Sequence, residues 1–383
     1  ESGKIINMDE SASKETGVKD AYLRIYPTDG YGNQQMIRDI IAHEKIDAII
    51  HFTDPRQWIW LYQMEHEIRQ KIPIVYYNIW DDLPTPAYNT NYYKSSDLLL
   101  SISKQTYGIN KRLLPDYEDW QLQYVPHGIN QKKYFKIEPG DTKLNQFKNK
   151  HNIDKFDFKV LYMNRNIRRK QPGDVILAYK HFVEQLESDE QKKCCLVFHT
   201  APSDENGTDL KAVCEAMIPE QNVVFTHDVQ PFFNDEEMNY MYNSANVYIN
   251  LASNEGFGLG SAEALMTKTP IVVNVTGGLQ DQCGFKKKDG SYLTADNISL
   301  QGSPLTPYIF DDRVQYEDAG NALLFWYKKN QKDIDKCVEQ GFKYITDDKI
   351  QMTSKHMSNS FVNHLTTLFK KWNPKPKYTL EIV

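Results

Sequence analysis

Short apolar runs alternate with helix-forming segments along most of the chain, and this alternation constrains the fold more than any other feature. Residues 158–163 and 194–199 are apolar runs, whereas Val175, Tyr179 and Phe182 between them recur at helical spacing. Continuous apolar runs are typical of parallel strands that are covered on both faces. The pattern therefore predicts an α/β fold of parallel strands joined by crossover helices.

The alternation occurs on both sides of a charged segment with few apolar residues, 136–157. A chain of 383 residues is also longer than the chain that one hydrophobic core usually serves, so we expect two domains. We place the boundary near the middle, with one domain over residues 1–140 and the second over 141–353. Two such domains leave a cleft at the carboxyl ends of their strands, where open α/β sheets bind ligands.

The individual elements follow from the same patterns. We predict strands at 22–26, 47–52, 74–77, 98–102, 122–125, 158–163, 194–199, 223–226, 245–251 and 270–275. We predict helices at 36–43, 56–70, 174–186, 210–217, 235–242 and 261–266, and two or more between 318 and 372. Ser103 is a predicted helix N-cap, and residues 1–20 are predicted to be a disordered or linking start.

A glycine-rich loop, residues 254–260 (NEGFGLG), joins a predicted strand to the helix at 261–266. The free N–H groups at a helix N-terminus suit a phosphate. Glu255 and Glu263 would repel a phosphate, so we expect them to bind hydroxyl groups. A ligand with both groups, such as a nucleotide sugar, meets both demands. The alternatives are that the glycines mark only a tight turn and that Glu263, in a first helical turn, only favours the helix dipole.

A cluster of cations, residues 165–170 (RNIRRK), directly follows the predicted strand 158–163. Arginine forks and a lysine would neutralise a diphosphate leaving group well. The alternative is a solvated basic loop before a helix. Because this run and the glycine-rich loop both follow strands of one sheet, we expect both to open onto the same cleft.

These residues match a family. Arg165 is followed five positions later by Lys170, Glu255 is followed eight positions later by Glu263, and residues 276–278 (TGG) come after the next strand. This combination resembles the C-terminal domain of retaining GT-B glycosyltransferases of family 4 (glycosyl transferases group 1). Residues 125–130 (VPHGIN) resemble the segment that closes the N-terminal domain of that family, and the resemblance extends from about Tyr22 to Leu368.

The resemblance implies a GT-B fold, in which two Rossmann-like domains face each other across a cleft. Residues 1–140 would form the acceptor-side domain and 141–353 the nucleotide-sugar-binding domain. A helix within 354–383 would cross back to the N-terminal domain. The implied activity is retaining, metal-independent transfer of a sugar from a nucleoside-diphosphate sugar, with a UDP- or GDP-sugar expected, to a glycan, lipid-linked or other acceptor. No cofactor is implied beyond the donor substrate.

The resemblance also implies roles for individual residues. Arg165 and Lys170 match the pair that binds the donor diphosphate and stabilises its charge. Glu255 matches the acid that contacts the transferred sugar, and Glu263 matches the acid that binds the ribose hydroxyls. The backbone amides of the loop would hold sugar and phosphate; the residues concerned are Gly256, Phe257, Gly258 and Leu259.

Two features concern the N-terminal domain. The family has a glycine-rich loop after its first strand, and no such loop precedes Tyr22. Either the chain lacks that strand and loop, which would bear on its activity, or residues 29–32 (DGYG) take the role. We expect the former, because Tyr26-Pro27 and Tyr31-Gly32 resemble a stretch further into the family. Asp81, beside Asp82, lies where the family has an acidic residue facing the cleft; the alternative is that both acids cap the next turn.

Composition limits the other function classes. The net charge of −6 argues against wholesale electrostatic binding of nucleic acid. Five cysteines without a CxxC pair favour the cytoplasm over a disulfide framework and argue against a metal–thiolate site. No apolar run approaches the ~18 residues of a membrane span, so no transmembrane segment is predicted.

Three other function classes are compatible with parts of this pattern. A glycoside hydrolase is disfavoured, because it needs a carboxyl with a raised pKa, whereas a helix N-terminus beside Arg and Lys favours the ionised form. A catalytically silent GT-B subunit would bind nucleotide or a partner protein. An enzyme acting on a nucleic-acid base would contact DNA through residues 165–170, Lys286–Lys288 and the tail near Lys370.

Overall fold

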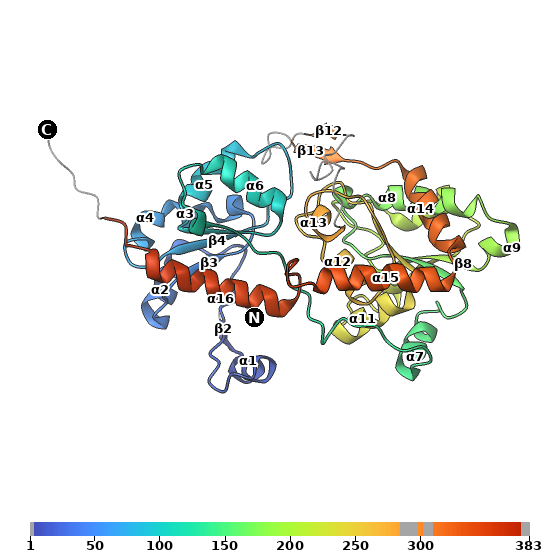
Figure 1. Cartoon of the computed structure of the whole chain (residues 1–383), viewed down its shortest axis with the longest axis horizontal. Helices are drawn as coiled ribbons and strands as arrows, with labels where there is room; N and C mark the ends of the chain where they lie inside the picture. Colours follow the sequence, from blue (N-terminus) through green and yellow to red (C-terminus); the bar gives the residue numbers. More distant parts are fainter. Residues whose placement is uncertain (1–3, 284–297, 302–308, 377–383) are drawn as a thin grey trace.

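The protein consists of two α/β domains lying side by side, each built on its own parallel sheet (Figure 1). The computed structural model describes residues 4–283, 298–301 and 309–376. Parallel strands and helices thus confirm the α/β fold predicted from the alternation.

The sheet of the N-terminal domain has the order β3-β4-β5-β6, with every neighbouring pair parallel. Its strands are β3 (Ile49–His51), β4 (Ile74–Asn78), β5 (Leu98–Ser101) and β6 (Leu122–Tyr124). The two central strands are buried at every residue, which is why their sequences read as continuous apolar runs. Its helices are α2 (Gln34–Glu44), η1 (Pro55–Trp58), α3 (Ile59–Gln63), α4 (Glu65–Ile68), η2 (Ala87–Asn89), α5 (Thr90–Lys94), α6 (Lys104–Leu113) and η3 (Asp119–Gln121).

The sheet of the C-terminal domain has the order β11-β10-β7-β8-β9, again parallel throughout. Its strands are β7 (Phe158–Tyr162), β8 (Cys194–Phe198), β9 (Val223–Phe225), β10 (Val247–Asn250) and β11 (Ile271–Val273). Its helices include α7 (Thr142–Lys150), η4 (Arg168–Lys170), α8 (Pro172–Val183), α9 (Ser188–Gln191), α10 (Leu210–Met217), η5 (Thr226–Asp228), α11 (Asp235–Ser244), α12 (Leu259–Met266) and α13 (Leu279–Cys283). Strand pair β12 (Ile298–Gln301) and β13 (Ile309–Asp312) and helices α14 (Tyr316–Lys328) and α15 (Gln331–Thr346) follow.

Two apolar clusters cover the two faces of this C-terminal sheet. One contains Val175, Tyr179 and Phe182, the apolar positions of α8 that the sequence predicts at helical spacing, together with Leu186 just beyond the helix. The other joins α7 and α11 to the opposite face through residues such as Phe147 and Met241. Because apolar clusters cover both faces of the sheet, ligands can reach it at the carboxyl ends of its strands. The polar loops that follow the strands lie at these ends.

The last helix, α16 (Ser354–Lys371), lies against the N-terminal domain, as Figure 1 shows. Phe361 packs edge-on against Tyr77 of β4, with 5.2 Å between ring centroids. The chain segments that cross between the domains pair with each other, because Ile129 N–H donates to Met352 O (3.0 Å) and Ser354 N–H donates to Ile129 O (3.0 Å).

Several local predictions differ from the structure. Residues 56–70 form three short helices and not one, because the backbone leaves the helical region at Trp58 (φ −119°, ψ 31°) and at Met64 (φ −107°, ψ 16°). Residues 1–20 are not irregular throughout: β1 (Ile6–Asn7) pairs with β2 (Arg24–Ile25), and α1 (Asp9–Thr16) lies between them without a buried residue. Segment 136–157 contains α7, whose N-terminus is capped by the Asp141 side chain.

Candidate functional site

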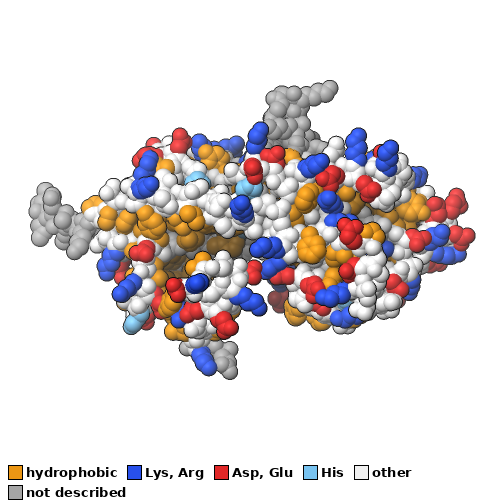
Figure 2. Space-filling model, turned by 60° about the horizontal axis from the view of Figure 1, so that its bottom comes forward, with side chains coloured by type: hydrophobic (Ala, Val, Ile, Leu, Met, Phe, Trp, Pro, Cys, Tyr) orange, Lys and Arg blue, Asp and Glu red, His pale blue; other side chains and the backbone are white. Residues whose placement is uncertain are grey.

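A cavity of about 450 Å³ opens between the two domains at the carboxyl ends of β7 and β10. Figure 2 shows the molecule hollowed at this junction, with Lys, Arg, Asp and Glu side chains near the rim. The C-terminal wall is formed by Met163, Asn164, Arg169, Lys170, Met238, Tyr242, Glu255, Gly256, Phe257, Gly258, Leu259, Gly260 and Glu263. The N-terminal wall is formed by Phe52, Ile79, Asp81, Ile102 and His127.

The glycine-rich loop leads directly into α12, as the sequence predicts. Gly258 is the N-cap in the left-handed region (φ 86°), and a Cβ there would meet Leu279 Cδ2 at 2.5 Å, so only glycine fits. The free amides at the start of α12 therefore line the cavity. This geometry suits an anionic group.

The TGG segment supports that loop from behind. Gly278 N–H donates to Glu255 O (2.8 Å), and a Cβ on Gly277 would lie 2.1 Å from the same oxygen. The side chain of Gln282 donates to the carbonyls of Phe257 (2.5 Å) and Gly258 (3.0 Å). These contacts explain why glycines recur here: two stretches of backbone pack directly on each other.

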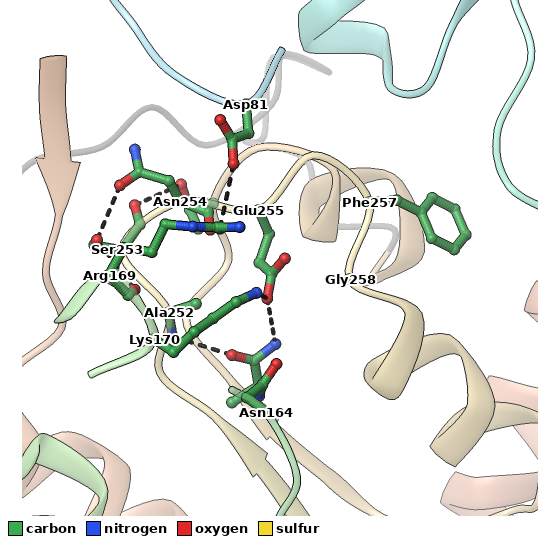
Figure 3. A network of polar contacts seen from close by, with 12 residues as sticks. Asp81, Asn164, Arg169, Lys170, Ala252, Ser253, Asn254, Glu255, Phe257 and Gly258 are labelled. Atoms are coloured by element: carbon green, nitrogen blue, oxygen red, sulfur yellow. Dashed lines mark hydrogen bonds and ion pairs between the residues drawn. The ribbon is translucent and has the colours of Figure 1, made fainter. Parts of the chain in front are cut away.

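Lys170 and Glu255 form a buried ion pair at the centre of the C-terminal wall, with Nζ 2.5 Å from Oε1 (Figure 3). Asn250 Nδ2 donates to the same oxygen (3.1 Å). Burial lowers the pKa of Lys170, and the Glu255 carboxylate opposes that shift. A cation fixed by its partner and largely withdrawn from water is well placed to stabilise added negative charge.

Arg169 bridges the two walls. Its Nη1 donates to Asn254 O (2.8 Å) and lies 3.3 Å from Asp81 Oδ2, across the cleft from β10 (Figure 3). Asp81 thus faces the cleft, as the resemblance implies. The alternative, in which Asp81 and Asp82 cap the next turn, gains no support, since η2 begins after Pro86 without a side-chain cap.

Arg165 lies apart from Lys170. Its guanidinium donates to Asp204 (Nε to Oδ2, 2.9 Å), its side chain is 61% exposed, and it is not among the described residues that line the cavity. Arg168 pairs with Asp311 of β13 (3.1 Å). The basic run is therefore divided: Arg165 and Arg168 contact carboxylates outside the cavity, whereas Arg169 and Lys170 line it. Sequence reasoning did not single out Arg169.

Glu263 points at a tyrosine. Tyr242 Oη donates to Glu263 Oε2 (2.6 Å), and burial raises the pKa of Glu263 while the Tyr242 hydrogen bond opposes that shift. Because α12 begins at Leu259, Glu263 is its fifth residue and lies beyond the first turn. The helix-dipole explanation for this residue was therefore wrong, and the carboxyl is held instead by side-chain hydrogen bonds with Tyr242 and Tyr134.

The N-terminal wall holds residues that sequence reasoning missed. Phe52 stacks on Tyr77 (5.2 Å between centroids), and His127 packs edge-on against Phe257 of the glycine-rich loop (5.3 Å). The VPHGIN segment was the only signal for His127. Phe52 had no signal, because it became part of the site only through tertiary packing.

Two further properties of the described residues concern metal binding and membrane spans. Among residues 4–283, 298–301 and 309–376, no group of three or more His, Cys, Asp or Glu side chains is arranged to hold a metal ion. Within the same described ranges, no helix is both long enough and apolar enough to cross a membrane. The predicted nucleic-acid contact Lys286–Lys288 lies outside the described residues.

Comparisons with known proteins agree with the geometry. Residues 144–297 match the family model described as glycosyl transferases group 1. Alpha-monoglucosyldiacylglycerol synthase of Acholeplasma laidlawii is 26% identical over 185 residues, which are 48% of this chain and 43% of that relative. The match thus spans less than half the length of the curated relative.

Solved structures share the fold at low sequence identity. HepE of Anabaena, solved with UDP and glucose, aligns with a TM-score of 0.60 and 13% identity over 87% of this chain and 81% of that one. A glycosyltransferase of Rickettsia africae aligns with a TM-score of 0.64 and 14% identity over 94% and 88%. The predicted GT-B arrangement and the predicted relationship to glycosyltransferases are confirmed, whereas membership of family 4 and the retaining outcome stay predictions.

Proposed function

From the premise that this chain has the GT-B fold and that its residues 144–297 match the glycosyl transferases group 1, we propose that it transfers a sugar from a nucleoside-diphosphate sugar to an acceptor hydroxyl. A UDP- or GDP-sugar is the expected donor, and no metal or other cofactor takes part. We place the reaction in the cytoplasm, since all five cysteines are unpaired.

The observation that carries this proposal is the composition of one wall. Lys170, Glu255, Glu263 and the amides that begin α12 all line the same cavity, on the C-terminal domain. We assign Lys170 and those amides to the diphosphate, Glu255 to the sugar and Glu263 to the ribose hydroxyls. Arg169 joins Lys170 in this assignment. Arg165 reaches the diphosphate only if its contact with Asp204 opens.

The transfer that we propose keeps the anomeric configuration. The acceptor oxygen forms a bond to C1 of the sugar while the bond from C1 to the β-phosphate oxygen breaks. The nucleoside diphosphate leaves with that electron pair, and its phosphate oxygen takes the acceptor proton on the same face. Lys170 stabilises the charge that develops on the leaving phosphate. Closure of the two domains excludes water and limits donor hydrolysis.

A thermal-shift panel of UDP-, GDP- and ADP-sugars tests donor binding. A ligand at 100 times its dissociation constant stabilises the folded protein by about 2.7 kcal/mol, which is readily measured. We expect one nucleotide class to raise the melting temperature and Glu263→Gln to reduce that rise. The matched control is Glu236→Gln, because Glu236 lies on the exposed side of α11. Absence of any shift in the wild type, or an unchanged shift in Glu263→Gln, would contradict the assignment.

Turnover separates the enzyme from a silent GT-B subunit. Release of the nucleoside diphosphate is measured with glycan, lipid and nucleic-acid acceptors. Diacylglycerol belongs in this panel, because the curated relative is named as a synthase of a glucosyldiacylglycerol. Donor binding without turnover on any acceptor would favour the silent subunit, and turnover on a nucleic-acid base would identify that acceptor class.

A further inference from the structure

Helix α13 carries two neighbouring side chains that contact opposite walls of the cleft. Gln282 donates to Phe257 O and Gly258 O of the glycine-rich loop (2.5 and 3.0 Å). Asp281, the residue before it, accepts a hydrogen bond at Oδ2 from the backbone N–H of Lys104 (2.8 Å), the first residue of α6. Asp281 and Gln282 are both buried, at 3% and 1% exposure. One short helix of the C-terminal domain thus binds both the glycine-rich loop and the N-terminal domain (Figure 1).

Two groups of the N-terminal domain hold the Asp281 carboxylate. The N–H of Lys104 is one of the donors at the start of α6 that have no partner within their own helix. The second group is the hydroxyl of Tyr124, at the end of β6. Burial raises the pKa of Asp281 to about 6, while Lys104 and the Tyr124 hydroxyl oppose that rise. The carboxylate is therefore largely ionised near pH 7, and its hydrogen bond to the start of α6 is charge-assisted.

The first turn of α6 in turn holds the part of the N-terminal wall that contains Asp81. Thr106 Oγ1 donates to Trp80 O (2.8 Å), and Gln105 Nε2 donates to Asp81 O (3.2 Å). Asp81 lines the cavity and lies 3.3 Å from a guanidinium nitrogen of the opposite wall. The described lining of the cavity does not include Asp281, so this residue acts on the reaction through α6.

These hydrogen bonds connect one wall of the cleft to the other. The glycine-rich loop holds α13 through Gln282, Asp281 holds the start of α6, and α6 holds the backbone of Trp80 and Asp81. We propose that Asp281 is a positioning residue, which places the backbone of Trp80 and Asp81, on the acceptor side, opposite the bound donor. This inference rests on the proposed function, which defines the donor and acceptor sides.

Three variants separate this role from a general loss of stability. Asp281→Ala removes the acceptor of both hydrogen bonds. Asp281→Asn keeps an oxygen that can accept from the Lys104 N–H but loses the charge, so it should restore part of the contact. Asp141→Ala is the matched control, because Asp141 caps α7 within the C-terminal domain by accepting from the N–H of Leu144 (2.8 Å).

Hydrogen exchange measures whether α6 and the segment that it holds stay in place. In Asp281→Ala we expect the amide of Lys104 to lose protection about 10- to 100-fold, the effect of one hydrogen bond to a charged group. The amide of Trp80, which donates to Asn78 Oδ1 (3.0 Å), should also lose protection, because its segment is no longer fixed by α6. Both amides should recover in part in Asp281→Asn and keep their wild-type protection in Asp141→Ala.

Binding and turnover measure the consequence for the reaction. The dissociation constant of UDP, from isothermal titration, should stay within about twofold of wild type in every variant, because Asp281 lies outside the cavity. With UDP-glucose and the acceptor that the turnover panel identifies, kcat should fall about tenfold or more in Asp281→Ala, since misplacing one reactant has effects of that size. The KM for UDP-glucose should not change. GDP and GDP-mannose replace these ligands if the wild type binds only guanine nucleotides.

The outcomes distinguish this inference from the function on which it rests. If the wild type transfers no sugar, the proposed function is overturned, and the exchange at Trp80 alone decides the role of Asp281. If the wild type is active and Asp281→Ala keeps its kcat, or if Trp80 keeps its protection, only the role of Asp281 is overturned. Equal losses of kcat in Asp281→Ala and Asp141→Ala would show a general loss of stability, which also contradicts the proposal.

Discussion

The two walls of the cleft are built in opposite ways. The C-terminal wall pairs its charges within itself, as Lys170 does with Glu255, and uses backbone amides from the start of α12. The N-terminal wall is mainly apolar and aromatic. Among the described residues that line it, Asp81 is the acidic one. Its contact with Arg169 is the ion pair of the cavity that joins the two walls.

This difference suggests separate roles for the two walls: the C-terminal wall recognises the charges of the ligand, and the N-terminal wall fits its shape. A preorganised charged wall can bind a charged nucleotide before the domains meet. An apolar wall adds binding energy mainly by excluding water and by fitting the ligand. We therefore expect substitutions in the C-terminal wall to have large effects on donor binding, and those in the N-terminal wall to have smaller ones.

The largest effect should come from breaking the pair at the centre of the C-terminal wall. Lys170→Met leaves Glu255, which is 6% exposed, without its cation. Loss of one partner of a buried pair costs about 3–5 kcal/mol of unfolding free energy. Transferase turnover should fall about 100-fold or more. Thermal unfolding and nucleotide release measure the two effects.

The double variant Lys170→Met/Glu255→Gln separates stability from function. It removes both charges, so much of the lost stability should return while turnover stays low. A double variant that remains as unstable as Lys170→Met would show that the pair is not the cause.

The next largest effect should come from the backbone contact that supports the glycine-rich loop of the same wall. Gly277→Ala adds a Cβ that would lie 2.1 Å from Glu255 O, at a residue whose φ is +50°. We expect a loss of about 2–4 kcal/mol, from overpacking and left-handed strain together. Donor affinity should fall with it, because the loop backbone must shift. Gly108→Ala is the matched control, since nothing lies within 4 Å of its Cβ in α6; equal losses in the two variants would contradict this account.

A pH series tests the N-terminal wall beside Asp81. Burial, followed by the charge of Asp81, raises the pKa of Asp82 from 3.8 to about 8. The unfolded carboxyl ionises near pH 4, whereas the folded one keeps its proton to about pH 8. The stability that this group contributes is therefore complete below pH 4 and is lost as the pH rises through 8. The melting temperature of Asp82→Asn relative to wild type should rise between pH 5 and pH 8; a constant difference would contradict the shift.

The smallest effect should come from the contact between the walls. Asp81→Asn removes the charge opposite Arg169, where the two side chains are 23% and 40% exposed. Such partly solvated pairs contribute up to about 1 kcal/mol. We expect the KM for the donor to rise about two- to fivefold at low salt and less at high salt. A loss of turnover as large as that of Lys170→Met would make Asp81 part of the chemistry.

The sequence predicted the two walls unequally, for a physical reason. The C-terminal wall is assembled from local signals, since Glu255, Glu263 and the glycine-rich loop lie within ten residues and directly follow a strand. The strand–helix alternation likewise gave the α/β fold and most elements. Local motifs set which loops reach the edge of a sheet, and the structure agrees with them.

Side-chain directions and the N-terminal wall were beyond such signals. Within residues 165–170 the sequence offered four equivalent cations, and only packing decides that Arg169 enters the cavity while Arg165 contacts Asp204. Phe52, directly after β3, stacks on Tyr77 of β4, which packs edge-on against Phe361 of α16, so the wall depends on contacts between distant segments.

The central claim is that the C-terminal wall binds the diphosphate of a nucleotide sugar. A crystal structure of the protein with UDP, or with GDP if that nucleotide binds, tests it most directly. The account predicts phosphate oxygens within hydrogen-bonding distance of Lys170 Nζ and of the amides that begin α12, with the ribose at Glu263. A nucleotide bound elsewhere, or bound in this cleft with its phosphates away from Lys170 and α12, would contradict it.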